Sequence, residues 1–179
     1  MLEKEIKILL EKDEYDLLAE KLAFDSELCQ VNHYYYSAAC AEKRISVRVR
    51  EVGGRTLLQV KLPVSTEGSL AVREELEREL DSVPERIGAE LLSEVCGVNE
   101  DAVRLGSLAT VRRLSYQIDG VELALDRNDY LGITDYELEA EYTGDYPEEV
   151  VSLLKGLGIP ADRPMEGKYS RFLEKLRNK

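Results

Sequence analysis

Charged side chains recur at every second residue near both ends of the sequence. Glu3, Glu5 and Lys7 are spaced in this way at the start of the chain, and Glu137 and Glu139 repeat the spacing further along. Because successive side chains of a strand point to opposite faces, each set would lie on one face. Carboxylates two residues apart can offer oxygen ligands to hard divalent cations, so these pairs predict a Mg²⁺ or Mn²⁺ site.

Basic residues follow the same period in the middle of the chain. Arg48 and Arg50 share one face of their segment, Lys61 lies on one face of the next, and Glu75 and Glu77 align on a third. Guanidinium groups bind phosphate oxygens bidentately, and lysine acts as a point charge. A sheet closed on itself would direct both signs of charge into a shared polar interior that suits a metal and a polyphosphate. The alternative for any single strand is a solvated outer face.

The elements that must position these residues are mostly strands. Alternation predicts strands over residues 2–10, 30–37, 44–52, 55–62, 70–80, 107–117, 121–127 and 133–142, with turns at Gly53-Gly54, at Gly120 and between Asn128 and Gly132. Helical spacing predicts helices from Asp13, from Asp81 or Ser82 to Gly97, over 147–157 and over 164–175. Strands with helices at intervals, without regular βαβ alternation, indicate an antiparallel α+β or barrel fold.

Composition limits the class of protein. A length of 179 residues predicts one domain over 1–179, and 36 acidic against 24 basic residues give a net charge of −12. That charge disfavours a broad nucleic-acid-binding surface, so no nucleic-acid partner is expected. Three cysteines without Cys-x-x-Cys spacing, a charged N-terminus and no long apolar run predict a cytoplasmic protein with no membrane contact.

Several segments resemble the CYTH domain, the family of triphosphate tunnel metalloenzymes. The N-terminal Glu-x-Glu-x-Lys pattern is followed, in family order, by a paired-arginine strand, a lysine strand, an Arg-x-Glu-x-Glu strand, an Asp segment, a Glu-x-Glu segment and a C-terminal lysine motif. The matching residues are 3–7, 45–51, 57–63, 73–77, 125–132, 135–139 and 167–172. The resemblance covers nearly the whole chain. The chain is most similar to the small single-domain bacterial members and resembles the thiamine triphosphatases.

This resemblance implies an eight-stranded antiparallel β-barrel with flanking helices, whose interior binds a small-molecule triphosphate with Mg²⁺ or Mn²⁺. The implied metal ligands are Glu3, Glu5, Asp126, Glu137 and Glu139. The implied phosphate ligands are Lys7, Arg48, Arg50, Lys61, Arg73, Arg112 and Lys168, with Arg113 an alternative to Arg112. Glu75, Glu77 and Lys61 are the candidate catalytic residues, and the two glutamates either position metal or water or balance the basic lining.

Fold does not determine the reaction, so three activities are compared. Metal-dependent hydrolysis of a triphosphate is favoured, with inorganic tripolyphosphate ahead of thiamine triphosphate and nucleoside triphosphates. The alternatives are a class IV type of adenylate cyclase and a non-catalytic module that binds nucleotides or polyphosphate. His33 and the tyrosines Tyr34, Tyr35 and Tyr36 are interpreted as structural.

Overall fold

The computed structural model describes residues 4–67, 70–163 and 166–178, with side chains outside 64–73. These residues form nine strands and five helices, and seven pairings between the strands are antiparallel. They group into two compact units. The first unit comprises residues 30–108, and the second combines residues 4–29 with residues 109–178.

The first unit is a sheet with the hydrogen-bonded order β7-β2-β3-β4-β5. Its strands are β2 (Ser26–Tyr36), β3 (Ser46–Val52), β4 (Arg55–Glu67), β5 (Leu70–Leu80), the short β6 (Arg86–Ile87) and β7 (Ala102–Ser115), of which β2 and β7 continue into the second unit. The predicted hairpin is confirmed, because Gly53 and Gly54 join β3 to β4 with φ angles of 58° and 77°. Both values fall in the left-handed region, which glycine enters without steric cost.

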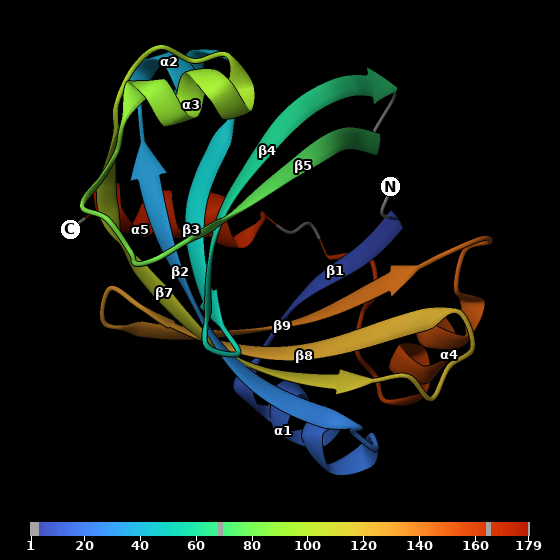
Figure 1. Cartoon of the computed structure of the whole chain (residues 1–179). Helices are drawn as coiled ribbons and strands as arrows, with labels where there is room; N and C mark the ends of the chain where they lie inside the picture. The colour runs from blue at the N-terminus through green and yellow to red at the C-terminus, as the bar shows by residue number, and fades with distance from the viewer. Residues whose placement is uncertain (1–3, 68–69, 164–165, 179) are drawn as a thin grey trace. The chain divides into compact units, whose positions relative to one another are not determined.

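Two helices cover the apolar face of this first sheet. In Figure 1, α2 (Ala38–Glu42) and α3 (Ala89–Cys96) lie together beyond the ends of β2 and β3. Leu92 of α3 packs with Val47, Val49 and Leu58 in one buried cluster. Side chains at alternate positions, such as Arg48, therefore point to the opposite, polar face.

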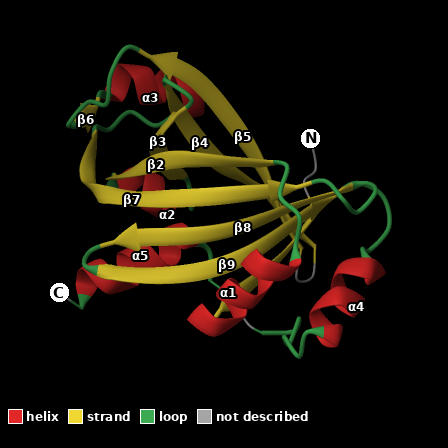
Figure 2. Ribbon diagram, turned by 90° about the horizontal axis from the view of Figure 1, so that it is seen from below, coloured by secondary structure: helices red, strands yellow, loops and turns green. Residues whose placement is uncertain are grey.

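The second unit contains the sheet order β1-β9-β8-β7. Its elements are β1 (Lys4–Leu10), α1 (Lys12–Lys21), β8 (Val121–Tyr130), β9 (Ile133–Tyr142), α4 (Glu148–Gly156) and α5 (Lys168–Arg177). Leu18 of α1 and Leu154 of α4 are buried with Leu125 and Leu138 of the strands, and Figure 2 shows both helices beside β8 and β9. The helix α5 instead contacts the polar side of the sheet through Lys168.

Two predicted helix starts are wrong because side chains cap the helices elsewhere. The first helix begins at Lys12 rather than after Asp13, and the side chain of Glu14 accepts the backbone N–H of Glu11 at 2.8 Å. The third begins at Ala89, whose N–H is accepted by Asp101 at 2.8 Å, so the predicted start at Asp81 or Ser82 fails. Asp101 is distant in sequence, which is why local signals missed it. The predicted end at Gly97 is confirmed by its left-handed backbone.

Other elements also differ from the prediction; for example, β2 begins at Ser26 rather than at residue 30, and β7 begins at Ala102 rather than at residue 107. The last helix begins at Lys168, whereas Pro164 lies outside the described residues. The short helix α2 was not predicted; Ser37 caps it by accepting the N–H of Cys40 at 3.3 Å. Strand β8 continues to Tyr130, so the turn before β9 contains only residues 131–132. In the described part of the chain, no helix is both long and apolar enough to cross a membrane.

Candidate metal and phosphate site

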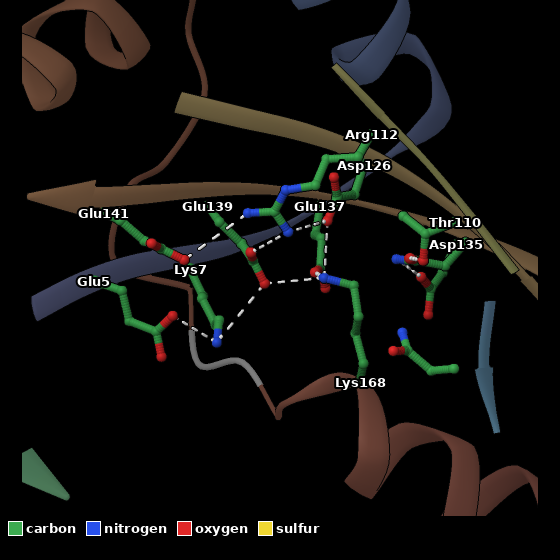
Figure 3. A network of polar contacts seen from close by, with 12 residues as sticks. Glu5, Lys7, Thr110, Arg112, Asp126, Asp135, Glu137, Glu139, Glu141 and Lys168 are labelled. Atoms are coloured by element: carbon green, nitrogen blue, oxygen red, sulfur yellow. Dashed lines mark hydrogen bonds and ion pairs between the residues drawn. The ribbon is translucent and has the colours of Figure 1, made fainter. Parts of the chain in front are cut away.

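Three carboxylates meet on the polar face of the second unit. Asp126 on β8 is paired in register with Glu137 on β9, and Glu139 follows two residues later on the same face. One carboxylate oxygen of each lies within 4.8 Å of those of the other two. Asp126 and Glu137 have no exposed surface, and Glu139 is 6% exposed. We call Asp126, Glu137 and Glu139 the acidic centre, which Figure 3 shows from close by.

Four cations contact the acidic centre, one of which, Arg171, pairs with Glu137. Arg112 on β7 donates to Asp126 at 3.2 Å and to Glu139 at 2.8 Å. Lys168 donates to the same two residues, at 2.9 Å each, and pairs with Glu137. Lys7 lies 3.7 Å from Glu139. Burying several carboxylates together requires such counter-charges, because an uncompensated buried charge strongly destabilises a fold.

Two oxygens of the acidic centre accept no hydrogen bond from the described residues; Glu137 Oε1 is in an ion pair with Lys168, and Asp126 Oδ1 has no such partner. Asp126 Oδ1 is buried and has no hydrogen-bond partner among the described residues. A buried carboxylate oxygen is ordinarily satisfied, so an orphaned one indicates a missing ligand. Oxygen-only ligands on a rigid sheet match the preferences of Mg²⁺ and Mn²⁺. The residues present therefore fit a divalent cation.

The pKa values of the two innermost cations shift in opposite directions. Burial penalises the charged ammonium and lowers the pKa of Lys168 to about 7, against the opposing effect of Asp126. Burial alone would also lower the pKa of Arg112, but the carboxylates of Asp126 and Glu139 outweigh it and raise that pKa. Arg112 therefore stays charged at neutral pH.

The register of β7 decides between the two adjacent arginines. Arg112 is opposite Asp126 and faces the acidic centre. Arg113 points to the other face, where its Nε donates to Glu27 at 2.7 Å. The sequence left this choice open because both residues are basic.

A second ion-pair network, which the sequence did not assign, adjoins the acidic centre. Arg171 on α5 donates to Asp135 at 2.9 and 3.2 Å and to Glu137 at 2.6 Å. Tyr130 donates its hydroxyl to Asp135 at 2.7 Å. The sequence offered two indications of this network. Asp135 lies two residues before Glu137, on the same strand face. Arg171 lies three residues after Lys168, so both cations are on one helix face.

The first unit carries its own set of predicted residues, on β3, β4 and β5. Lys61 forms an ion pair with Glu75 at 2.8 Å, and Arg48 lies 3.6 Å from the same carboxylate. Although burial alone would raise the pKa of Glu75, Lys61, Arg48 and Arg50 together hold it below its usual value. Glu75 is therefore ionised at neutral pH. We call Arg48, Arg50 and Lys61 the basic face.

Two amide side chains orient the basic face and were not predicted. Gln59 accepts from Arg48 Nε at 2.8 Å and donates to Glu77 at 2.8 Å. Asn32 accepts from Arg50 Nε at 2.9 Å. Both amides are buried, so they hold the guanidinium groups in fixed directions. Gln59 could have been found from its place two residues before Lys61 on the same strand face.

The remaining predicted residues lie at the edge of the acidic centre, apart from it, or outside the described residues. Glu5 is exposed and pairs with Lys7 at 2.7 Å. Glu3 and the side chain of Arg73 fall outside the described residues. His33 bridges Glu51 at 2.7 Å and Ser107 at 3.2 Å. Tyr34 and Tyr35 lie on opposite faces of β2 and are both buried, while Tyr36, on the same face as Tyr34, is exposed at the end of the strand.

A family comparison decides where the chain belongs. The model of the CYTH domain matches residues 1–160. The chain is a member of the CYTH domain family. The predicted family is thus confirmed, and the match extends over both units. A search of curated proteins found no match to the sequence.

Solved structures confirm the predicted α+β antiparallel fold class of this CYTH protein. A putative adenylate cyclase from Bacillus halodurans is 23% identical, with a TM-score of 0.72 over 96% of this chain and 99% of its own. A putative adenylyl cyclase from Hippeastrum, described as having a dominant triphosphatase activity, is 26% identical, with a TM-score of 0.74 over 97% and 96%. A protein from Pyrococcus horikoshii is 20% identical, with a TM-score of 0.66 over 97% and 99%. Family and neighbours support an enzyme that acts on triphosphates.

Proposed function

We propose that this CYTH protein is a divalent-metal-dependent triphosphatase that releases phosphate from inorganic tripolyphosphate. The observation that carries the proposal is the acidic centre, three buried carboxylates with one unpartnered oxygen, bordered by Arg112, Lys168 and Lys7. Simple anion binding needs the cations but gains nothing from three buried carboxylates, which disfavours the non-catalytic module.

Asp126, Glu137 and Glu139 would hold Mg²⁺ or Mn²⁺, with Glu5 and Glu3 as further candidates. A bound cation would neutralise charge that develops on the phosphate oxygens. The protein's own cations supply the rest of the charge. Lys7, Arg112 and Lys168 would contact phosphate oxygens in the second unit, and the basic face with Arg73 would do so in the first.

Glu75 is our candidate for orienting the attacking water. Its lowered pKa keeps it ionised at neutral pH, and Lys61 holds it at 2.8 Å. Glu77 accepts from Gln59, so we assign it mainly to charge balance on the basic face. An ionised carboxylate can accept a proton from water as the new bond to phosphorus forms.

The rival activity is cyclisation of ATP, since two of the similar structures are described as putative adenylate cyclases. Cyclisation requires the ribose 3′-hydroxyl in line with the α-phosphorus, whereas hydrolysis requires only a positioned water. The assigned residues are ligands for phosphate and metal, the parts common to every candidate substrate. The dominant triphosphatase activity ascribed to the Hippeastrum protein also favours hydrolysis.

An assay with a panel of substrates tests the proposal. Tripolyphosphate, thiamine triphosphate and ATP are incubated separately with Mg²⁺ and with Mn²⁺, and the products are separated by ion chromatography. We expect phosphate from tripolyphosphate at the highest kcat/KM. Cyclic AMP as the main product of ATP, with negligible tripolyphosphate hydrolysis, would establish the cyclase instead.

We further propose that residues 1–179 act as one domain and that the protein is cytoplasmic.

A further inference from the structure

Lys168 contacts the same carboxylates that are the candidate metal ligands. Its Nζ lies 2.9 Å from Asp126 Oδ2 and 2.9 Å from Glu139 Oε1, and it also pairs with Glu137. The lone pairs that accept from this ammonium are those that a divalent cation would use. The ammonium and the metal therefore compete for the acidic centre.

Charge balance gives a reason for this placement. The four least exposed carboxylates on this part of the sheet, with side chains at most 16% exposed, are paired with four cations, two of which also pair with the more exposed Glu5 and Glu141. The carboxylates are Asp126, Asp135, Glu137 and Glu139, and the cations are Lys7, Arg112, Lys168 and Arg171. Without a metal, withdrawing one cation leaves a buried carboxylate uncompensated, which is costly. A bound metal would itself compensate the buried carboxylates, so the ammonium of Lys168 would no longer be needed beside them.

Among the four cations that contact the acidic centre, Lys168 is the one placed to leave. Lys7 lies 3.7 Å from Glu139 and is paired more closely with Glu5, at 2.7 Å. Arg112 also lies 3.9 Å from Glu141 and belongs to a central strand. Arg171 contacts Glu137 of the acidic centre, but two further bonds to Asp135 hold it in place. Lys168 is the first residue of α5, on a flexible four-carbon stem, and its ion-pair partners among the described residues are Asp126, Glu137 and Glu139 alone.

We propose that Lys168 stands in for the divalent cation in the metal-free protein, and that metal binding exchanges the ammonium out of the acidic centre. Arg171 keeps α5 attached to Asp135 during the exchange. The released ammonium is then available to a phosphate oxygen of the substrate. Metal and triphosphate therefore bind with positive coupling, because each favours the state in which Lys168 has left the carboxylates. This inference rests on the metal site of the proposed function.

Metal affinity in the absence of substrate tests the exchange. Dissociation constants for Mn²⁺ are measured by electron paramagnetic resonance of the free ion, for the unmodified protein, Lys168→Met and Lys155→Met. The control Lys155 is exposed on α4, so its variant removes the same charge away from the centre. If Lys168 occupies the centre about nine-tenths of the time, its removal tightens Mn²⁺ binding about tenfold. Lys155→Met should bind like the unmodified protein.

The outcomes separate this inference from the proposed function. Unchanged or weaker Mn²⁺ binding by Lys168→Met, with the unmodified protein binding the ion, overturns the exchange and leaves the metal site intact. Absence of Mn²⁺ binding by every protein, Lys168→Met included, overturns the metal site and with it the proposed function.

A second measurement needs no variant. Acetylation of lysine amines by an N-hydroxysuccinimide ester is measured by peptide mass spectrometry with and without saturating Mg²⁺. Release from the carboxylates should raise the labelling of Lys168, while that of Lys155 stays constant. Constant labelling of Lys168 in the presence of bound Mg²⁺ would show that the ammonium remains in place and would contradict the exchange.

Discussion

The ammonium of Lys168 lies 2.9 Å from Oδ2 of Asp126, a carboxylate with no exposed surface. The two residues are 42 positions apart, one at the start of the last helix and the other within β8. The helix therefore supplies a cation to the buried face of the sheet. Lys168 is a predicted phosphate ligand and Asp126 is a predicted metal ligand. Because the two are in contact, binding of the metal and binding of the substrate should influence each other.

Replacing one carboxylate of the acidic centre by an amide should strongly lower metal-dependent turnover. We expect Glu139→Gln to lower kcat/KM on tripolyphosphate by more than about 100-fold, since even the outer partners of metal ligands contribute about 10–100-fold. The control is Glu149→Gln on the exposed side of α4. Circular dichroism establishes that both variants fold. Full activity of Glu139→Gln, or activity that persists in excess chelator, would refute the metal assignment.

The two adjacent arginines form a matched pair for stability. Arg112→Ala removes a buried partner of Asp126 and Glu139, and should lower the free energy of unfolding by about 3–5 kcal/mol. Arg113→Ala breaks a more exposed pair with Glu27 and should cost about 1 kcal/mol or less. Urea denaturation measures both. Equal losses would mean that burial of the acidic centre does not depend on Arg112.

The increase in Tm that a ligand causes tests whether the basic face binds the triphosphate. Tripolyphosphate with Mg²⁺ should raise the Tm of the unmodified protein, and Lys61→Ala should lose most of that increase while melting at a similar temperature without ligand. The control is Arg55→Ala, whose exposed pair with Glu79 lies away from Lys61. We expect its ligand-induced shift to be unchanged. A lower Tm for Lys61→Ala by the same amount with and without ligand would instead make Lys61 a structural partner of Glu75.

The pair of Glu14 and Arg163 should make stability depend on pH. Both carboxylate oxygens of Glu14 accept from Arg163 at 2.6 Å, and these bonds hold the pKa of Glu14 below its usual value of 4.5. The stabilisation is complete above pH 4.5 and is lost as the pH falls through the lower pKa of the folded state. Glu14→Gln should therefore cost about 1 kcal/mol at pH 7 and progressively less in acid.

Urea denaturation at pH 7 and at about pH 3.5 measures how far Glu14→Gln lowers the free energy of unfolding at each pH. Glu20→Gln, at an exposed position on the same helix, is the control and should change stability little at either pH. If Glu14→Gln lowers the free energy of unfolding by the same amount at both pH values, the ion pair is not the origin of the loss.

The sequence by itself determined which faces of the strands are polar. A period of two is a local property, so the alternation around Arg48 and around Glu137 predicted their strands and their shared faces correctly. The hairpin at Gly53-Gly54 was equally predictable, because its two positive φ angles require particular residues. The family could also be identified, since its motifs follow one another in order along the chain.

Only the tertiary structure decided which charges meet. The register of β7 against β8 put Arg112 rather than Arg113 beside Asp126, and a shift by one residue would have exchanged them. The start of α3 depends on Asp101, and the pairing of Arg171 with Asp135 depends on where α5 lies against the sheet. Such contacts join residues far apart in sequence. Their energies come from burial and pairing after the chain has folded, so no local pattern encodes them.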